Sequence, residues 1–449
     1  MQLVTWDDDS VLDFVDPAAA EGLDERRRAL LHAIGGDGAS SFGGSKPCLG
    51  PLSPGCRACG EGRWSCLFLN AVCNARCFFC PGGMTHRDAL PHAERTSFPS
   101  PDAYACYVER LGFGGVAFSG GEPFLTFDRF HDYLRGLRDR LGSAPYLWAY
   151  TNGLAARPDQ LAAAVEAGLD EVRFDIAACD YDLDPVRAAV GVVPRVSVEI
   201  PAIPEDAERV KHLLPDLAAA GVDHLHLHQL MLTGDNGPRL VERPYTFVRT
   251  APPAVVESEL AALEVLAHAA AEGIDLPVQY CSLCFKSRWQ GRTEDLRAGP
   301  HVMRGPDALT AAGRVRRITV RASHDAVAGL GDHLRRRDLD PVFWEVAPSG
   351  TSLTLHPSLL PHLPPACDDL HLTWYKVVVG DREEVEWARR SPDYRDLELG
   401  PELTIGVALA PLCAPMPVPR AKVEALLRGE SGAFAPFEEI PTGLPDYGC

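Results

Sequence analysis

The sequence has no segment that could lie within a membrane. None of its apolar runs reaches the length of a transmembrane helix, about 18 consecutive residues, so we expect no membrane partner. The first residues, MQLVTWDDDSVLDF, are acidic and have no apolar core, unlike a secretory signal peptide. These absences predict a cytoplasmic protein.

Positively charged residues are also fewer than negatively charged ones. The chain has 43 Lys and Arg residues against 62 Asp and Glu residues, a formal net charge of −19. Because phosphate backbones are bound by clustered Lys and Arg, we expect no nucleic-acid partner. No internal repeat or low-complexity tract interrupts the chain. Its 46% hydrophobic and 23% charged residues are typical of a folded globular protein.

Cysteine, in contrast, is abundant. The chain has 14 cysteines and no visible signal peptide, and in a reducing cytosol such thiols are not expected to form disulfides. They indicate metal or redox chemistry instead.

Strand-like and helical patterns alternate through the first half of the chain. We expect strands at 64–72, 115–120, 146–153, 170–177, 195–203 and 223–232, with helices at 101–112, 127–142, 157–168 and 206–221 between them. This alternation predicts an α/β fold built of parallel β/α units. A complete eight-stranded barrel takes about 250 residues, so the roughly 170 residues here predict a partial, six-stranded TIM-like barrel.

The flanking segments differ from this pattern. Residues 1–63 are expected to hold a helix and a Cys-rich loop, and the Gly, Pro and Ser content of 35–62 predicts no regular elements there. Residues 64–300 are expected to form the barrel with a Cys-containing extension. The segment 301–449 is expected to be a separate α+β domain without a recognisable catalytic motif.

Three closely spaced cysteines, Cys73, Cys77 and Cys80, directly follow the first expected barrel strand. The carboxyl ends of barrel strands are where catalytic groups lie in such folds. Three thiolates suit a [4Fe-4S] cluster in which one iron lacks a protein ligand and can bind a substrate or cofactor. A zinc site completed by a distant His is the alternative.

The motif CNARCFFC (73–80) resembles the CxxxCxxC motif of the radical S-adenosylmethionine (SAM) superfamily, and FSGGEP (118–123) at the end of the second strand strengthens the resemblance. The resemblance implies that the open iron binds the amino and carboxylate groups of SAM. It implies that Phe79 lies near the adenine and that Gly120, Gly121, Glu122 and Pro123 hold the amino group. It further suggests SAM contacts on the next strands, for which the candidates are Thr151, Asn152, Arg173 and Glu199; a simple turn is the alternative at Asn152.

A second set of cysteines surrounds the motif. Cys56 and Cys59 form one CxxC pair and Cys281 and Cys284 another, the spacing by which two thiols bind one metal centre. We expect an auxiliary [4Fe-4S] cluster held by Cys56, Cys59, Cys66 and one thiol from 280–284, for which Cys281 is the candidate; Cys48 or Cys284 is then left without a metal. A zinc site on the same thiols is the alternative.

Three alternating histidines, His224, His226 and His228, occupy the sixth expected strand and face one side of it. They could bind zinc, but we favour the interpretation that this face lines the substrate cavity. His228, Gln229 and Asp175 are the candidate catalytic residues.

The resemblance implies reductive cleavage of SAM to a 5′-deoxyadenosyl radical, which abstracts hydrogen from a substrate. We expect a small-molecule biosynthetic intermediate that undergoes dehydration, epimerisation or rearrangement, with electrons from a flavodoxin- or ferredoxin-type donor. A peptide- or protein-modifying enzyme, including a glycyl-radical enzyme activase, is the first alternative. A non-catalytic iron–sulfur electron carrier is the second.

Overall fold

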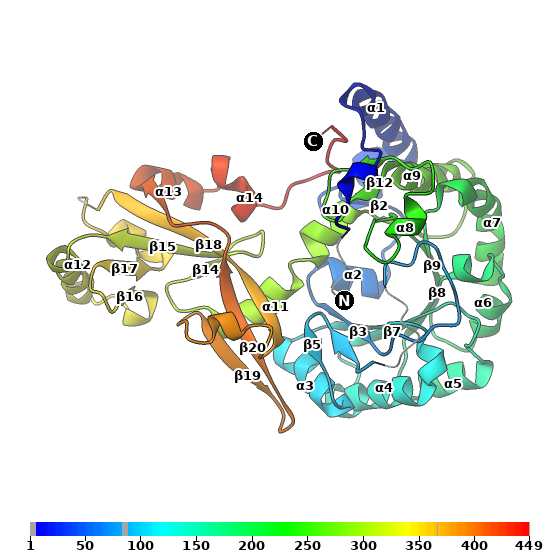
Figure 1. The fold of residues 1–449 in the computed structure, drawn as a ribbon, viewed down its shortest axis with the longest axis horizontal. Coiled ribbons are helices and arrows are strands. Elements are labelled where there is room, and N and C mark those ends of the chain that lie inside the picture. The colour runs from blue at the N-terminus through cyan, green and yellow to red at the C-terminus, as the bar shows by residue number, and fades with distance from the viewer. Residues whose placement is uncertain (1–5, 83–88, 366, 449) are drawn as a thin grey trace. The chain divides into compact units, whose positions relative to one another are not determined.

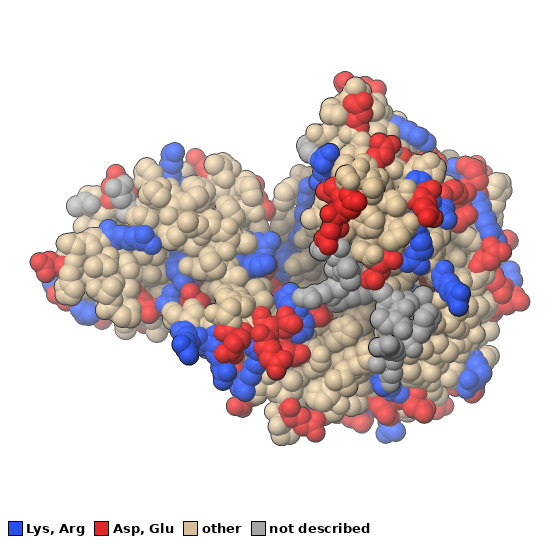
Figure 2. Space-filling view, viewed as in Figure 1, with Lys and Arg blue, Asp and Glu red and all other residues tan. Residues whose placement is uncertain are grey.

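The computed structural model describes residues 6–82, 89–365 and 367–448, and the chain divides into two compact units. Unit 1 comprises Met1–Gln290, Leu399–Leu403 and Thr442–Cys449, and unit 2 comprises Gly291–Glu398 and Thr404–Pro441. On the face seen in Figure 2, acidic and basic side chains are interspersed.

Unit 1 is built on a mostly parallel sheet. Within the described residues, strands β3, β6, β7, β8, β9, β10 and β13 are hydrogen-bonded in that order, each parallel to the next, and no pairing closes the ring. The prediction of an α/β fold with a partial TIM-like barrel is confirmed, with β13 as a seventh parallel strand that the sequence analysis missed. In sheet order the strands are β1 (Ser40–Ser41), β2 (Lys46–Leu49), β13 (Val278–Cys281), β10 (His224–His228), β9 (Val196–Pro201), β8 (Glu171–Phe174), β7 (Tyr146–Thr151), β6 (Gly115–Ser119), β3 (Trp64–Phe68), β4 (His92–Ala93) and β5 (Thr96–Ser97).

Helices surround these strands (Figure 1). Most of them connect one parallel strand to the next, and local signals set the ends of α3: the Ser100 hydroxyl accepts a hydrogen bond from the Ala103 amide at its start, and Gly112 adopts the left-handed conformation at its end. The helices of unit 1 are α1 (Pro17–Ile34), α2 (Pro54–Gly60), α3 (Pro101–Leu111), α4 (Phe127–Leu141), α5 (Pro158–Glu166), α6 (Asp184–Ala189), α7 (Ala207–Ala220), α8 (Gly237–Leu240), α9 (Val256–Ala271) and α10 (Leu283–Phe285), with a π-helical turn η6 (Lys286–Gln290) and a hairpin of β11 (Phe247–Val248) and β12 (Ala254–Val255).

The prediction that residues 35–62 hold no regular elements is wrong. The Ser53 hydroxyl caps α2 by accepting from the Cys56 amide, and Pro54 occupies the first turn, so two local signals outweigh the glycines. Strand β2 forms because its backbone pairs with β13, which is more than 200 residues away in the chain and invisible to local analysis. Helix α2 packs against β3, β6 and β7 and lies within the ring of strands (Figure 1).

Unit 2 is an antiparallel sheet with helices. One face of the sheet buries an apolar core that includes Ile318, Leu353, Leu372 and Trp374 against α12. The strands in sheet order are β16 (Trp344–Val346), β17 (Ser352–Leu355), β15 (Val315–Arg321), β18 (Asp369–Asp381), β20 (Leu403–Pro411) and β19 (Tyr394–Leu399), with β14 (Ala308–Leu309) and β21 (Met416–Pro419) at the sides; the helices are α11 (Thr293–Val302), α12 (His324–Arg336), α13 (Arg420–Leu427) and α14 (Ala435–Glu438).

Among the helices that the structure describes, none is both long enough and apolar enough to span a bilayer.

Candidate active site

The cysteine loop lines a cavity at the carboxyl ends of the barrel strands. The cavity has a volume of about 240 Å³. Its walls combine the three thiols with polar side chains from β7 to β10 and with an apolar rim. The lining residues are Cys73, Ala75, Cys77, Phe79, Cys80, Pro81, Tyr150, Thr151, Asn152, Asp175, Ala178, Glu199, Ile200, Pro201, His228, Gln229, Leu230, Met231 and Lys286.

Side chains from the segment after β10 hold the backbone of the cysteine loop. The Arg239 guanidinium donates to the Cys77 carbonyl at 3.1 Å, and the Asn236 amide donates to the Phe79 carbonyl at 3.1 Å. The Thr233 hydroxyl donates to the Pro81 carbonyl, also at 3.1 Å. Three successive parts of the loop are therefore fixed from one side, a feature that the sequence analysis missed because no motif marks it.

The glycines of the GGEP segment are required by a close backbone approach. A Cβ at Gly121 would lie 1.9 Å from the Val72 carbonyl oxygen, and one at Gly120 would lie 2.5 Å from the Asn70 carbonyl oxygen. The Gly121 amide donates to the Asn70 carbonyl at 3.0 Å, and the Glu122 amide donates to the Val72 carbonyl at 2.7 Å. The segment thus packs directly on the residues that lead into the cysteine loop.

Glu122 links two strand ends. Its carboxylate is 1% exposed and accepts from the Thr151 hydroxyl at 2.9 Å, the Asn152 amide at 2.8 Å and the Phe124 amide at 3.1 Å. Burial raises its pKa, and these three hydrogen bonds oppose the rise. Glu122 therefore fixes Thr151 and Asn152, which line the cavity, whereas Gly120, Gly121, Glu122 and Pro123 are not among the lining residues.

The predicted catalytic side chains meet at the cavity. Asp175 follows β8, and its Oδ1 is buried without a hydrogen-bond partner among the described residues. Burial raises the pKa of Asp175 to about 7. His228 Nε2 contacts Glu199 Oε1 at 2.6 Å, and the Gln229 side-chain Oε1 accepts from the Leu283 backbone amide at 2.9 Å.

The three loop thiols line one cavity together with Asp175. Burial raises the pKa of Cys73 and Cys80, and burial together with Asp175 and the other two thiols raises that of Cys77 to about 12. Without a bound cation these cysteines would be neutral thiols at physiological pH. The site thus favours a ligand that brings its own positive charge.

A second cavity inside the barrel gathers the thiols of Cys56, Cys59 and Cys281. Cys56 and Cys59 come from α2 and Cys281 from the end of β13, opposite His228 in the parallel register. The remaining lining residues are Lys46, Gly55, Trp64, Trp148, Tyr150, Arg173, Glu199, His228, Phe285, Lys286 and Gln290.

Two cations contact these thiols. Lys46 is 0% exposed, and its Nζ lies 2.5 Å from Cys281 Sγ and 4.5 Å from the centre of the Phe285 ring. Arg173 Nη1 lies 3.9 Å from Cys56 Sγ and 2.8 Å from Glu199 Oε2. Burial alone would raise the pKa of Cys281, but Lys46 and His228 outweigh it and lower that pKa to about 6.

Two sequence predictions for these residues change in the structure, and one residue was missed. Arg173, a candidate SAM contact, lines the second cavity and not the first. Cys66, a candidate cluster ligand, lines neither cavity, and burial raises its pKa to about 12. Lys46 was missed altogether, because only the pairing of β2 with β13 brings it to Cys281.

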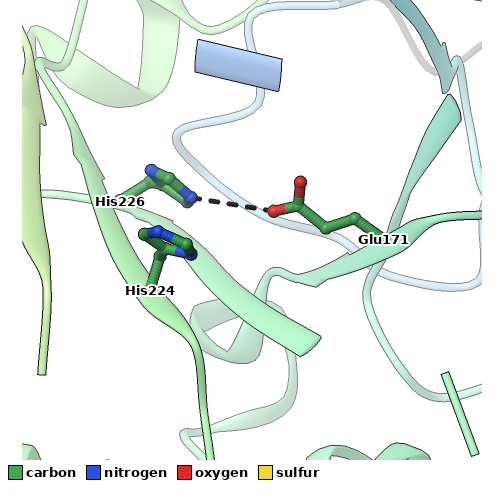
Figure 3. Close-up of side chains that lie close together, drawn as sticks. All are labelled: Glu171, His224 and His226. Carbon is green, nitrogen blue, oxygen red and sulfur yellow. Dashed lines mark ion pairs between the residues drawn. The ribbon is translucent and has the colours of Figure 1, made fainter. Parts of the chain in front are cut away.

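The deepest histidines, His224 and His226, lie beside a carboxylate whose hydrogen-bonding capacity is already filled. Figure 3 shows His224 and His226 facing Glu171, with His226 Nε2 4.0 Å from Glu171 Oε1. Both Glu171 oxygens already accept two hydrogen bonds each: Oε1 from Arg173 Nε and Ser197, and Oε2 from Arg173 Nη2 and Tyr146. Because the carboxylate is saturated and paired with a guanidinium, a further cation would be repelled. His228 lies apart on Glu199, so the three histidines do not converge on zinc.

A partial barrel of parallel strands with a CxxxCxxC loop after its first strand defines a class of iron–sulfur enzyme. Residues 68–236 match the family model described as the radical SAM superfamily. Residues 68–236 therefore form a radical SAM domain, which makes the chain an enzyme.

A relative from Methanocaldococcus jannaschii is 22% identical over 302 residues, which cover 64% of this chain and 79% of the relative. Its name describes it, provisionally, as a glycyl-radical enzyme activating enzyme. Among solved structures, SuiB of Streptococcus suis bound to S-adenosylmethionine aligns with a TM-score of 0.35 and 10% identity over 49% of this chain and 50% of SuiB. Methylornithine synthase aligns with a TM-score of 0.32 and 14% identity over 51% of this chain and 64% of that chain.

Proposed function

We propose that this enzyme reductively cleaves SAM at a [4Fe-4S] cluster held by Cys73, Cys77 and Cys80. The resulting 5′-deoxyadenosyl radical abstracts hydrogen from a small-molecule biosynthetic intermediate. The observation that carries the proposal is the cavity: three thiols without a fourth share it with Asn152, Asp175 and His228 at the carboxyl ends of the strands. The bound cluster and SAM supply the radical chemistry, and the protein positions the reacting carbon and excludes water.

The chain's own residues have separate roles in this site. Asn152 donates to Asn74 at 2.8 Å and lies 3.6 Å from Cys73 Sγ, so it orients the start of the cysteine loop. Asp175 offers an unpartnered carboxylate oxygen for a substrate hydroxyl or ammonium group. The apolar rim of Phe79, Ile200 and Leu230 keeps water from the reacting atoms.

The second cavity is proposed to hold an auxiliary cluster on Cys56, Cys59 and Cys281. Among the described residues, no set of three donors that includes a cysteine lies within 4.8 Å of one another. Zinc with four thiolates at about 2.3 Å would bring the sulfurs within about 4 Å, whereas the irons of a cluster each take a separate thiolate. The wider spacing therefore favours a cluster over zinc.

The walls of the first cavity support a small-molecule substrate. Beside the three thiols they present mainly apolar side chains with a few polar groups, among them Asp175 and His228, as ligand pockets do. Activation of a glycyl-radical enzyme is the second candidate, because the relative from Methanocaldococcus jannaschii is named for that activity. A flavodoxin- or ferredoxin-type protein is the proposed electron donor.

The test is the production of 5′-deoxyadenosine and methionine by the anaerobically reconstituted full-length enzyme with dithionite. We expect both products from the parent enzyme and from Cys367→Ala, whose thiol lies in unit 2, and neither from the Cys73→Ala/Cys77→Ala/Cys80→Ala variant. Equal cleavage by all three proteins would contradict the proposal. A glycyl-radical EPR signal on an added glycyl-radical enzyme would favour the activase instead.

A further inference from the structure

Unit 2 has a cavity of its own. The cavity has a volume of about 310 Å³ and is lined only by residues of unit 2, from the antiparallel sheet and its loops. This volume lies at the lower end of the range for small-molecule pockets, about 300–1,000 Å³. We infer that the cavity binds a small organic anion, a carboxylate or a phosphate ester. The inference goes beyond the proposed function and does not depend on it.

The cavity lies on the face of the sheet opposite the apolar core of unit 2. Because side chains of a strand point alternately to the two faces, Ile318 of β15 joins the core while Arg317, Thr319 and Arg321 line the cavity. The lining positions on the neighbouring strands are Ser352 and Thr354 on β17 and Thr373 and Tyr375 on β18. Hydroxyl groups from three adjacent strands therefore form one wall of the cavity.

This wall is more enclosed than an ordinary solvent-facing side of a sheet. Thr373 is 5% exposed and Arg317 is 7% exposed. Three prolines from separate loops, Pro348, Pro392 and Pro415, line the cavity as well. Hydrogen bonds to a ligand are stronger where water is partly excluded, so the polar groups lie where they can bind a small molecule.

Two of the arginines are paired to different degrees. Arg317 is held by paired hydrogen bonds to Asp307 and Asp393, which are not lining residues, so its charge is already neutralised. Arg304 Nη1 donates to Glu345 Oε2 at 2.8 Å. The Arg304 Nε is buried without a hydrogen-bond partner among the described residues, with Asp393 Oδ1 3.5 Å away. Arg304 thus retains a donor that Asp393, occupied by Arg317, does not satisfy.

The third arginine, Arg321, is exposed at the end of β15. Its guanidinium has no ion-pair or hydrogen-bond partner among the described residues. The cavity therefore presents three arginines and one carboxylate, Glu345, together with several hydroxyl groups. Carboxylate or phosphate oxygens would accept from the unused guanidinium donors, whereas a cationic or apolar molecule would leave these donors unsatisfied. This excess of donors selects an anion.

Isothermal titration calorimetry on the reconstituted full-length enzyme tests the inference. Glycerol 3-phosphate and glutarate are the two probes, at constant ionic strength, and the tighter binder shows whether a phosphate ester or a carboxylate is preferred. We expect saturable binding of one molecule per chain. Arg321→Met should weaken it about tenfold by removing the unpaired cation. Arg336→Met is the matched control, because it removes the same charge from the exposed face of α12, beyond the core on the other side of the sheet, and should bind like the parent.

The double variant Thr319→Val/Thr354→Val provides a second test without a change in charge. The two hydroxyls lie 3.3 Å apart and contact each other, so replacing both leaves neither without its partner and keeps the β-branched shape. We expect weaker binding of the preferred probe with the free energy of unfolding of unit 2 unchanged.

Three results would overturn the inference. The first is no saturable binding of either probe. The second is equal weakening by Arg321→Met and Arg336→Met, since the loss of net charge alone would then explain the effect. The third is binding that neither Arg321→Met nor Thr319→Val/Thr354→Val alters, which would place the anion elsewhere in the chain.

Discussion

At the scale of single residues, Glu122 fixes Thr151 and Asn152 in the wall of the first cavity without lining that cavity itself. Its carboxylate accepts from Thr151, Asn152 and Phe124 while almost wholly buried. Glu122→Gln keeps the shape but replaces one acceptor oxygen by a donor group that faces other donors. We expect a loss of about 1–3 kcal/mol in the free energy of unfolding and weaker SAM binding.

Urea unfolding and SAM titration of Glu122→Gln would measure both effects. Glu25→Gln, on the exposed face of α1, is the matched control and should leave both unchanged. If Glu122→Gln behaves like the control, the carboxylate does not hold the strand ends together.

The buried histidine His224 predicts acid sensitivity. Burial, with smaller contributions from His226 and Arg173, lowers its pKa from 6.5 to about 4. Between these values the unfolded chain binds a proton that the folded chain does not, so stability falls as the pH drops through this window. Between about pH 7 and about pH 5 the free energy of unfolding should fall in both proteins, but by about 1–2 kcal/mol less in His224→Gln than in the parent.

Urea unfolding at the two pH values, followed by tryptophan fluorescence, would measure the difference. Parallel pH profiles for parent and variant would show that His224 does not titrate in this way.

How far single residues could be predicted depends on the range of their contacts. Cys73, Cys77 and Cys80 were identifiable because their spacing is local in the sequence. Lys46 was not, because its contact with Cys281 spans 235 positions. Arg173 and Asp175 are two positions apart, which in a continuous strand would place them on one face, but β8 ends at Phe174 and the two side chains reach different cavities.

At the scale of elements, the approach of β6 to the segment after β3 controls the cysteine loop. An alanine at Gly121 would put its Cβ 1.9 Å from the Val72 carbonyl oxygen, a backbone atom that can move only with the loop. We expect Gly121→Ala to lose the iron of the first cluster and SAM cleavage while it retains the second cluster.

Iron analysis and product assays would test this, with Gly22→Ala in α1 as the control, since a Cβ there meets nothing within 4 Å. Full SAM cleavage by Gly121→Ala would mean that the close approach is not needed.

Most elements of the barrel were predictable because they are periodic. The strands and helices expected between residues 64 and 232 all occur, most of them a few residues shorter than expected. Helix α9 and strand β13 were missed. Helix α2 and strand β2 were not expected, because the Gly, Pro and Ser content of their segment predicted no regular elements. Of these four, β2 and β13 depend on tertiary contacts, because they pair with each other across more than 200 positions.

At the scale of the whole molecule, the metal candidates all lie in unit 1. Ligands that bind only the folded state stabilise it, so removal of iron should lower the melting temperature of unit 1 and leave that of unit 2 unchanged. Calorimetry before and after anaerobic chelation would show this as the shift of one of two transitions. A common shift of both transitions would mean that the two units unfold together.

A substitution in unit 2 should destabilise that unit without affecting the metal sites of unit 1. Arg317 is buried and forms paired hydrogen bonds to Asp307 and Asp393 at 2.7–3.0 Å. Arg317→Met leaves two acids unpaired and should destabilise unit 2 by about 3–5 kcal/mol without loss of iron. Calorimetry and iron analysis of this variant would check both statements, and a drop in iron content would contradict the assignment of the clusters to unit 1.

The central claim of this account is that the barrel holds two clusters, one of which binds SAM. The most direct test is anaerobic iron and sulfide analysis with EPR on the parent enzyme and the Cys73→Ala/Cys77→Ala/Cys80→Ala variant. We predict about eight irons in the parent, about four in the variant, and an EPR change on addition of SAM that only the parent shows. Zinc in place of iron, or a SAM-dependent signal that persists in the variant, would contradict the account.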